Sequence, residues 1–213
     1  MEELRKQDLK TGTTTVGLIT KDSIVLAADM QATLGNLGYD LESKKLYKIT
    51  KRIALTNAGS VGDSVTIIRF LRSRAKLYET DREAPITPKA LTTFLSNVLN
   101  ANRYAPYAVQ FIIGGVVGKP QLFEVMPYGA VIEREHYATS GSGTQIALAV
   151  LDEGYKKDMS QEEGIALAVK AIAASKKRDI YTGGRTISVM VLDGSGIREI
   201  PEAEIKKHIP NHK

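Results

Sequence analysis

The sequence predicts a single α+β domain built as a four-layer αββα sandwich, in which two stacked antiparallel sheets are covered by helices on both sides. Strand-like and helix-like segments alternate in blocks along the chain: strands, two helices, strands, two helices, strands. The 213 residues are 43% hydrophobic and 25% charged, which is enough to bury one large core. No repeat, low-complexity tract or internal linker interrupts the chain, so we expect one folded unit.

The first block consists of two strand pairs. Short β-branched runs at residues 13–19 and 23–28 are separated by a polar turn, which indicates a hairpin. Residues 45–50 alternate between polar and apolar side chains, and residues 52–57 form a further strand before a turn at residues 58–60. The chain is therefore expected to open with a β layer.

Two helices are predicted next. Apolar residues recur at helical spacing from residue 63 to residue 80. Thr87 is a suitable N-cap for a second helix, and Pro88 is favoured in its first turn. The apolar stripe of this second helix consists of Ala90, Leu91, Phe94, Leu95, Val98 and Leu99.

A second β layer and a second pair of helices complete the pattern. Strand-like segments at residues 109–117, 121–125 and 130–132 are separated by turns that contain glycine and proline. After a glycine and serine cluster at residues 140–143, helices are predicted at residues 144–155 and 160–177. Ser160 and Glu163 form a capping box at the start of the latter helix. Strands at residues 186–192 and 197–200 close the chain as a hairpin across Asp193-Gly194.

The composition excludes several classes of function. The sequence has no cysteine, and its three histidines, His136, His208 and His212, lack a metal-binding spacing, so we expect no disulfide, metal or other cofactor. The net charge of +5 is dispersed among acidic residues, and no basic stretch with interleaved aromatics suggests nucleic acid. No apolar run is long enough to span a membrane, and the N-terminus lacks a signal-like stretch. We expect a soluble, cytoplasmic protein.

The ordinary catalytic motifs are missing from the sequence: it has no serine nucleophile elbow, no phosphate-binding loop and no suitably spaced carboxylates. The sequence Gly12-Thr13-Thr14-Thr15-Val16-Gly17 offers another chemistry. A threonine that becomes N-terminal carries its own base, because its free α-amine titrates near neutral pH. The alternative interpretation is that residues 13–15 are β-branched residues that merely begin a strand.

A series of sequence blocks extends along nearly the whole chain. The blocks are GTTTVG at 12–17, VLAAD at 25–29, SKKLYKI at 43–49, AGSVGD at 58–63, FLSNVLN at 94–100, ATSGSG at 138–143 and KKRDIYTGG at 176–184. In these blocks the chain resembles proteasome beta subunits of the archaeal 20S type. The resemblance implies the N-terminal nucleophile hydrolase fold and a threonine-type endopeptidase that acts on unfolded polypeptides. It further implies that residues 1–12 are a leader removed by self-cleavage between Gly12 and Thr13, which leaves residues 13–213 as the catalytic domain. The implied partners are proteasome alpha subunits, other beta subunits in seven-membered rings and, indirectly, a regulatory ATPase.

The resemblance also assigns a role to individual residues. Thr13 is the expected nucleophile, Asp29 and Lys45 form a charged pair beside it, and Ser142, Asp179 and Thr182 surround the amine. A buried ammonium at Lys45 would favour the developing alkoxide, and Asp29 would compensate its charge. The backbone N–H of Gly59 is suited to bind the oxyanion, and Thr33 and Gly59 would pair with the substrate backbone. The expected substrate pocket contains Ala32, Asn57 and Val61.

Some positions depart from the family pattern, and alternatives follow from them. Thr182 stands where the family usually has serine, and Met30 and Gln31 stand where it commonly has basic residues. Taken singly, Asp29 could be a strand-end carboxylate, Lys45 a solvated lysine and Asp179 part of an ordinary helix end. A catalytically silent beta subunit that serves as a ring scaffold is one alternative function. Others are the bacterial two-ring relative of the proteasome, which the sequence QATLGN at 31–36 resembles, and an amidohydrolase for small amides.

Overall fold

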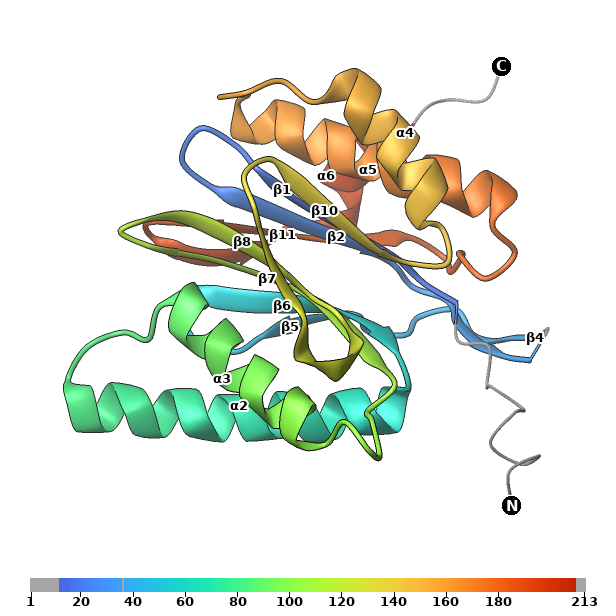
Figure 1. Cartoon of the computed structure of the whole chain (residues 1–213). Coiled ribbons are helices and arrows are strands. Elements are labelled where there is room, and N and C mark those ends of the chain that lie inside the picture. Colours follow the sequence, from blue (N-terminus) through green and yellow to red (C-terminus); the bar gives the residue numbers. More distant parts are fainter. Residues whose placement is uncertain (1–11, 36, 210–213) are drawn as a thin grey trace.

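Four layers of secondary structure make up the chain, as the sequence predicts (Figure 1). The computed structural model describes residues 12–35 and 37–209, so residues 1–11 of the expected leader lie outside the described part. Two five-stranded antiparallel sheets lie face to face in the centre, and helices cover the outer face of each. Within the described residues, no helix has both the length and the apolar character needed to cross a membrane.

The first sheet contains the strand that follows Thr13. Its order is β10 (Tyr137–Gly141), β1 (Thr14–Ile19), β2 (Ile24–Asp29), β11 (Ile187–Asp193) and β12 (Gly196–Glu199), with all neighbours antiparallel. Its outer face is covered by α4 (Thr144–Gly154), α5 (Gln161–Arg178) and α6 (Glu202–His208). The predicted hairpin turn between the first two strands and the predicted closing hairpin are both confirmed.

The second sheet lies between the first sheet and the other helices. Its order is β5 (Leu46–Lys48), β6 (Ile53–Gly59), β7 (Val109–Val117), β8 (Lys119–Val125) and β9 (Val131–Arg134). The helices α2 (Val61–Arg82) and α3 (Pro88–Ala101) cover its outer face. Thr87 caps α3 as predicted, because its side chain accepts the N–H of Ala90 at 3.1 Å. Ser160 and Glu163 form the predicted capping box of α5.

Alternation along the strands divides the core into three parts. In β2, Val25 and Ala27 face the helices of the first sheet, whereas Ile24, Leu26 and Ala28 face the second sheet. The space between the sheets is filled by side chains from both, including Ile112 and Leu122 of β7 and β8. A third cluster joins the second sheet to α2 and α3. This packing fixes the beginning of β1 and the ends of β2 and β6, which border the site described below.

Several boundaries differ from the sequence-based prediction. Strand β10 was not predicted, and it includes Ser140 and Gly141, which the sequence suggested as a break. Helix α6 was not predicted either, and α2 is two residues longer at each end than residues 63–80. The turn between β7 and β8 consists of Gly118 alone, which has φ of +83°, so that Lys119 and Pro120 belong to β8. A left-handed glycine allows this tight connection.

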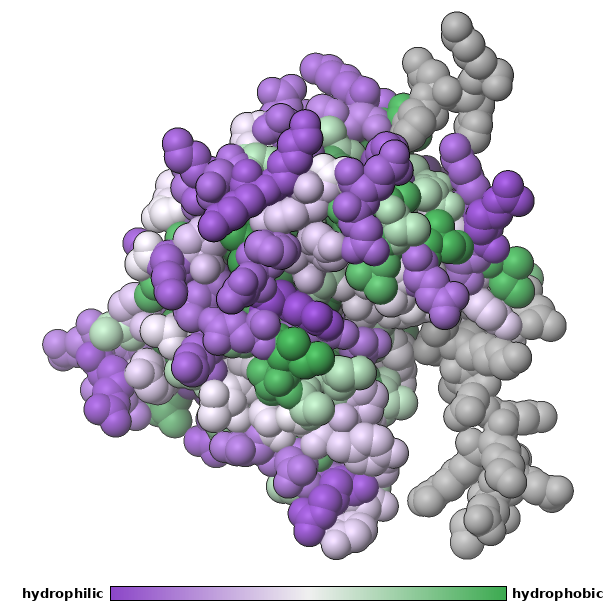
Figure 2. Space-filling model, turned by 45° about the horizontal axis from the view of Figure 1, so that its top comes forward, coloured by the Kyte–Doolittle hydropathy of each residue, from purple (hydrophilic) through white to green (hydrophobic). Residues whose placement is uncertain are grey.

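A small hairpin was also missed by the prediction, and it projects beyond the two sheets in Figure 1. It consists of β3 (Ala32–Leu34) and β4 (Leu37–Asp40). Four large hydrophobic side chains are exposed on or next to it: Leu34, Leu37, Tyr39 and Leu41. The face of the molecule shown in Figure 2 is mostly hydrophilic, with small and separate hydrophobic clusters.

Candidate active site

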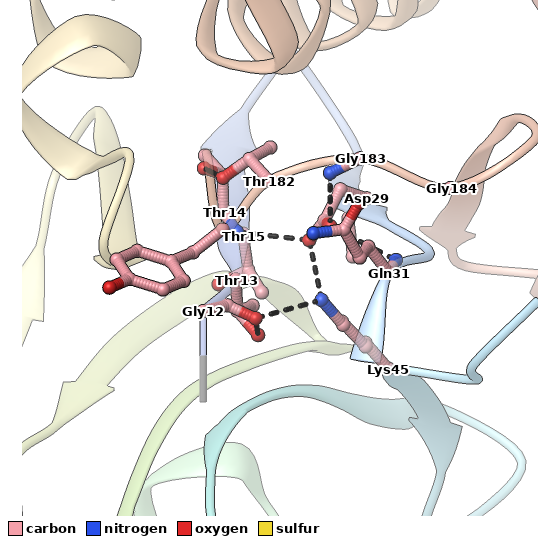
Figure 3. Close-up of polar contacts among 12 residues, drawn as sticks. Gly12, Thr13, Thr14, Thr15, Asp29, Gln31, Lys45, Thr182, Gly183 and Gly184 are labelled. Atoms are coloured by element: carbon pink, nitrogen blue, oxygen red, sulfur yellow. Dashed lines mark hydrogen bonds and ion pairs between the residues drawn. The ribbon is translucent and has the colours of Figure 1, made fainter. Parts of the chain in front are cut away.

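Thr13 lies directly before β1 of the first sheet, near Lys45 of the second sheet (Figure 3). Its side chain is buried, with 4% of its surface exposed. The Thr13 hydroxyl donates a hydrogen bond to the carbonyl oxygen of Gly12 at 2.5 Å. Because Gly12 is still attached, the nitrogen of Thr13 is an amide N–H here, and it stands for the α-amine that cleavage would release.

Gly12 is itself held in a tight place. A Cβ atom at this position would lie 1.6 Å from the Cβ of Tyr181, in the loop between α5 and β11. No larger residue therefore fits without movement of that loop. Its carbonyl oxygen accepts a second hydrogen bond, from the ammonium of Lys45 at 3.4 Å. Two donors therefore converge on the carbonyl of the Gly12-Thr13 peptide bond, which increases the polarisation of that carbonyl.

Lys45 and Asp29 form a buried ion pair. Lys45 precedes β5 in the second sheet, Asp29 ends β2 in the first, and Nζ lies 2.7 Å from Oδ1. Burial lowers the pKa of Lys45 from its ordinary value of 10.5, while the charges of Asp29 and, more weakly, Asp179 oppose this shift. An ammonium that is buried in this way interacts strongly with any negative charge that develops nearby.

Asp29 is completely buried and accepts hydrogen bonds on both oxygens. Besides Lys45, Oδ1 accepts the backbone N–H of Thr14 at 3.0 Å. Oδ2 accepts the backbone N–H groups of Gln31 at 3.1 Å and Gly183 at 2.9 Å. These contacts satisfy the carboxylate and fix its orientation, and they bring together β1, β2 and the loop that precedes β11.

A second group of side chains is linked to the nitrogen of Thr13 through Ser142. The Thr13 N–H donates to the hydroxyl of Ser142 at 3.2 Å. Ser142 and Thr182 both donate to the Oδ2 atom of Asp179. The hydroxyl of Thr182 also contacts that of Thr14, 2.6 Å away. The side chain of Thr182 is thus accommodated with its hydroxyl directed into this group, although it is β-branched.

The other expected residues line one cleft with Thr13 and Lys45. They are Ala32 and Thr33 of β3, Asn57 and Gly59 of β6, and Val61 at the start of α2. The amide of Asn57 is already engaged, because its Oδ1 accepts the hydroxyl of Ser64 in α2 at 2.5 Å. Gly59 ends a strand instead of lying within a turn. Its φ of +113° and the nearby Ala108 carbonyl, 2.2 Å from where a Cβ would lie, require glycine.

Other contributors to the site were not among the expected site residues. The side chain of Gln31 donates to the hydroxyl of Thr33 at 3.1 Å and to the carbonyl of Ile180 at 3.2 Å, so it joins β3 to the loop before β11. Gln31 lies in the two-residue connection between β2 and β3, and its residue type alone gave no signal of these contacts. The backbone N–H of Gly183 gave no signal in the sequence either, since every residue except proline has one. In residues 12–35 and 37–209, no group of three His, Cys, Asp or Glu side chains is arranged to bind a metal.

Comparisons with known proteins identify the family of the chain. The family model described as "Proteasome subunit" matches residues 9–192. The "Proteasome subunit beta 2" of Thermococcus onnurineus is 49% identical over 190 residues, which cover 89% of this chain and 94% of the relative. The protein of the same name from Thermococcus gammatolerans is 46% identical over 91% of this chain and 96% of its own length. The "Proteasome subunit beta" of Methanocaldococcus fervens is 46% identical over 94% and 90%, respectively. With a family model that spans most of its length and relatives of this similarity, the chain belongs to the proteasome subunit family.

Proposed function

We propose that the chain is a catalytic beta subunit of a cytoplasmic 20S proteasome core, a threonine-type endopeptidase whose nucleophile is the hydroxyl of Thr13. The observation that carries this proposal is the meeting of the Thr13 hydroxyl and the Lys45 ammonium on the Gly12 carbonyl oxygen. The relatives are named as proteasome beta subunits, which supports the same assignment.

The first reaction is removal of the leader, residues 1–12. The Thr13 oxygen attacks the Gly12 carbonyl carbon, the Gly12-Thr13 C–N bond breaks, and the hydroxyl proton passes to the departing nitrogen. Water then hydrolyses the resulting ester, which releases the leader and leaves residues 13–213 with a free α-amine. Lys45 stabilises the charge on the oxygen atoms, and Asp29 holds Lys45 in place.

Peptide hydrolysis uses the same oxygen with the new α-amine as the base. Ser142, supported by Asp179 and Thr182, contacts this nitrogen in the unprocessed chain and would orient the amine afterwards. The N–H of Gly59 is the proposed oxyanion donor. Thr33 and Gly59 would bind the substrate backbone, while Ala32, Asn57 and Val61 form the pocket for its side chain.

Assembly with alpha subunits and further beta subunits in rings is part of the proposal. Exposed Leu34, Leu37, Tyr39 and Leu41 beside the cleft support it, because a soluble monomer rarely exposes so many large apolar side chains in one short segment. A regulatory ATPase would deliver unfolded polypeptides to such a particle.

The decisive experiment is the substitution Thr13→Ala in particles reconstituted with an alpha-type partner. We expect mass spectrometry to show the leader retained and a fluorogenic peptide to remain uncleaved, since removal of a nucleophile abolishes covalent catalysis. Thr66→Ala is the matched control, because this exposed threonine lies on α2. The silent-scaffold alternative makes the opposite prediction: unchanged particle activity in Thr13→Ala would contradict the catalytic assignment.

A further inference from the structure

The loop of residues 179–184, between α5 and β11, supports the proposed site at three points. Asp179 and Thr182 belong to the group that is linked to the Thr13 nitrogen through Ser142, and the Gly183 N–H contacts Asp29. The loop is attached to the segment after β2 through the Met30 N–H, which donates to the Gly183 carbonyl at 3.1 Å. A small displacement of residues 183 and 184 would therefore move a hydrogen-bond donor of the catalytic carboxylate.

Lys176, in the last turn of α5, holds the far end of this loop. Its ammonium donates to the carbonyl oxygen of Gly184 at 2.8 Å. Gly184 has little freedom to move: its φ is +90°, and a Cβ there would lie 2.6 Å from the carbonyl carbon of Met30. A charged donor gives a stronger hydrogen bond than a neutral one, so this contact restrains the loop more firmly than an amide would.

An ordinary role for a lysine in this place would be to face solvent and interact with the carbonyl end of the helix. Its neighbours Lys177 and Arg178 fit that description, because both are exposed. Lys176 differs from them: it is partly buried and its ammonium is directed to the loop. Burial lowers its pKa from 10.5, and the negative charge of Asp29 opposes the shift, so the ammonium is within electrostatic reach of the catalytic carboxylate.

We propose that Lys176 is a positioning residue for the active site. By holding the Gly184 carbonyl, it keeps the Gly183 N–H on Asp29, and Asp29 in turn keeps Lys45 at the Gly12 carbonyl. The inference rests on the proposed function of this site. Lys176 touches neither the substrate nor Thr13, and it acts through Gly184, Gly183 and Asp29.

The loop has other attachments, which separate positioning from folding. Gln31 holds the Ile180 carbonyl and Ser142 holds Asp179, and neither contact involves Lys176. Loss of the Lys176 ammonium should therefore leave the loop folded but displaced at Gly183. Misplacement of catalytic groups by an ångström or less lowers the rate by about 10-fold to about 100-fold.

The test compares three variants in particles reconstituted with an alpha-type partner. Lys176→Met keeps the aliphatic stem but removes the charge and the donors, Lys176→Arg keeps both, and Lys177→Met is the matched control. We expect Lys176→Met to lower kcat for a fluorogenic peptide by about 10-fold to about 100-fold, with KM within about twofold of the parent value. Arg should restore most of kcat, and the control should match the parent protein.

Several outcomes would overturn the inference. The first is a kcat for Lys176→Met within about twofold of the parent value. The second is a lower kcat that is fully explained by a lower melting temperature of the variant. The third is an equal kcat for the Met and Arg variants. Should Lys176→Met fail to assemble, Lys176→Gln replaces it, and kcat must then decrease in the order Lys, Arg, Gln; equal rates for Lys and Gln would refute the role. Thr13→Ala in the same preparation separates the two proposals, because activity that persists in that variant refutes the proposed function itself.

Discussion

The ion pair of Asp29 and Lys45 illustrates how single residues determine the chemistry of this site. Removal of either partner would leave the other charge buried and unpaired, which is more costly than loss of a surface pair. The four donors around Asp29 come from positions 14, 31, 45 and 183, so the carboxylate joins segments that are far apart in the sequence. The geometry of Lys45 consequently depends on the fold of the whole domain.

The lowered pKa of Lys45 leads to a prediction about pH. The ammonium is present below the pKa of the folded chain and is lost as the pH rises through it, and this pKa lies below 10.5. The rate of the proposed leader removal should therefore fall on the alkaline side at a pH below the pKa of a free lysine. Mass spectrometry of the unprocessed chain during assembly at a series of pH values measures this rate.

The free energy of unfolding should change with pH in the opposite direction, because of the same group. Between the folded-state pKa and 10.5 the unfolded chain binds more protons at this position, so the contribution of Lys45 to the free energy of unfolding increases with pH. Circular dichroism over the same pH series is the control. A rate of leader removal that stays constant up to pH 10.5, or that falls only where the fold is lost, would contradict the prediction.

Residues could be predicted from the sequence where their chemical type carries the information. Thr13, Asp29 and Lys45 belong to recognisable blocks, and the structure brings them together, with 2.7 Å between the two charged groups. Gln31 and Lys176 were not predicted as part of the site, because a glutamine in a short connection between strands and one of several basic residues at a helix end have ordinary explanations. The contacts of Gln31 with Ile180 and of Lys176 with Gly184 depend on the path of the loop at 179–184, which no local pattern specifies.

At the scale of elements, the close approach of the two sheets depends on glycine. A Cβ at Gly17 of β1 would lie 2.7 Å from a methyl group of Ile112 in β7, and one at Gly114 would lie 2.7 Å from a methyl group of Ile24 in β2. The neighbouring side chains are buried between the sheets and have no free space into which they could move. Both glycines thus set the spacing of the central layers.

We predict that Gly17→Ala destabilises the fold by about 1–3 kcal/mol through overpacking. Denaturant unfolding of the isolated subunit measures this value. Gly62→Ala is the matched control, because Gly62 lies in helix α2 with nothing within 4 Å of the added methyl group. It should be neutral or stabilise the helix by up to about 1 kcal/mol. Equal midpoints for the two variants would show that the sheets can adapt.

Element boundaries were predictable where turns and caps carry a local signal. The caps of α3 and α5 and the hairpin at Asp193-Gly194 are examples. Strand β10 was missed because residues 138–141, Ala-Thr-Ser-Gly, are small and polar, and pairing with β1 makes them a strand. Tertiary pairing commonly overrides β propensity in this way.

At the scale of the whole molecule, the αββα order follows from counting the predicted blocks, because each sheet needs a cover on the face that does not meet the other sheet. The projecting hairpin of β3 and β4 could not be inferred in that way. Its apolar residues are exposed instead of buried, so a rule that assigns apolar residues to a buried core does not account for them.

Thr13 and Thr33, on the two sides of the proposed site, are attached to this architecture in different ways. Thr13 continues β1, which pairs with β10 on one side and β2 on the other, whereas Thr33 belongs to the two-stranded hairpin outside both sheets. A central strand opens only with the whole domain, while a short exposed hairpin opens locally at much lower free energy. Warming should therefore raise KM before it lowers kcat, with kcat lost only at the temperature where circular dichroism reports melting. Hydrogen exchange should correspondingly be slowest in the amides of β1 and fast in those of β3 and β4. The reverse order would show that the strand after Thr13, the proposed nucleophile, is less stable than the hairpin that contains Thr33.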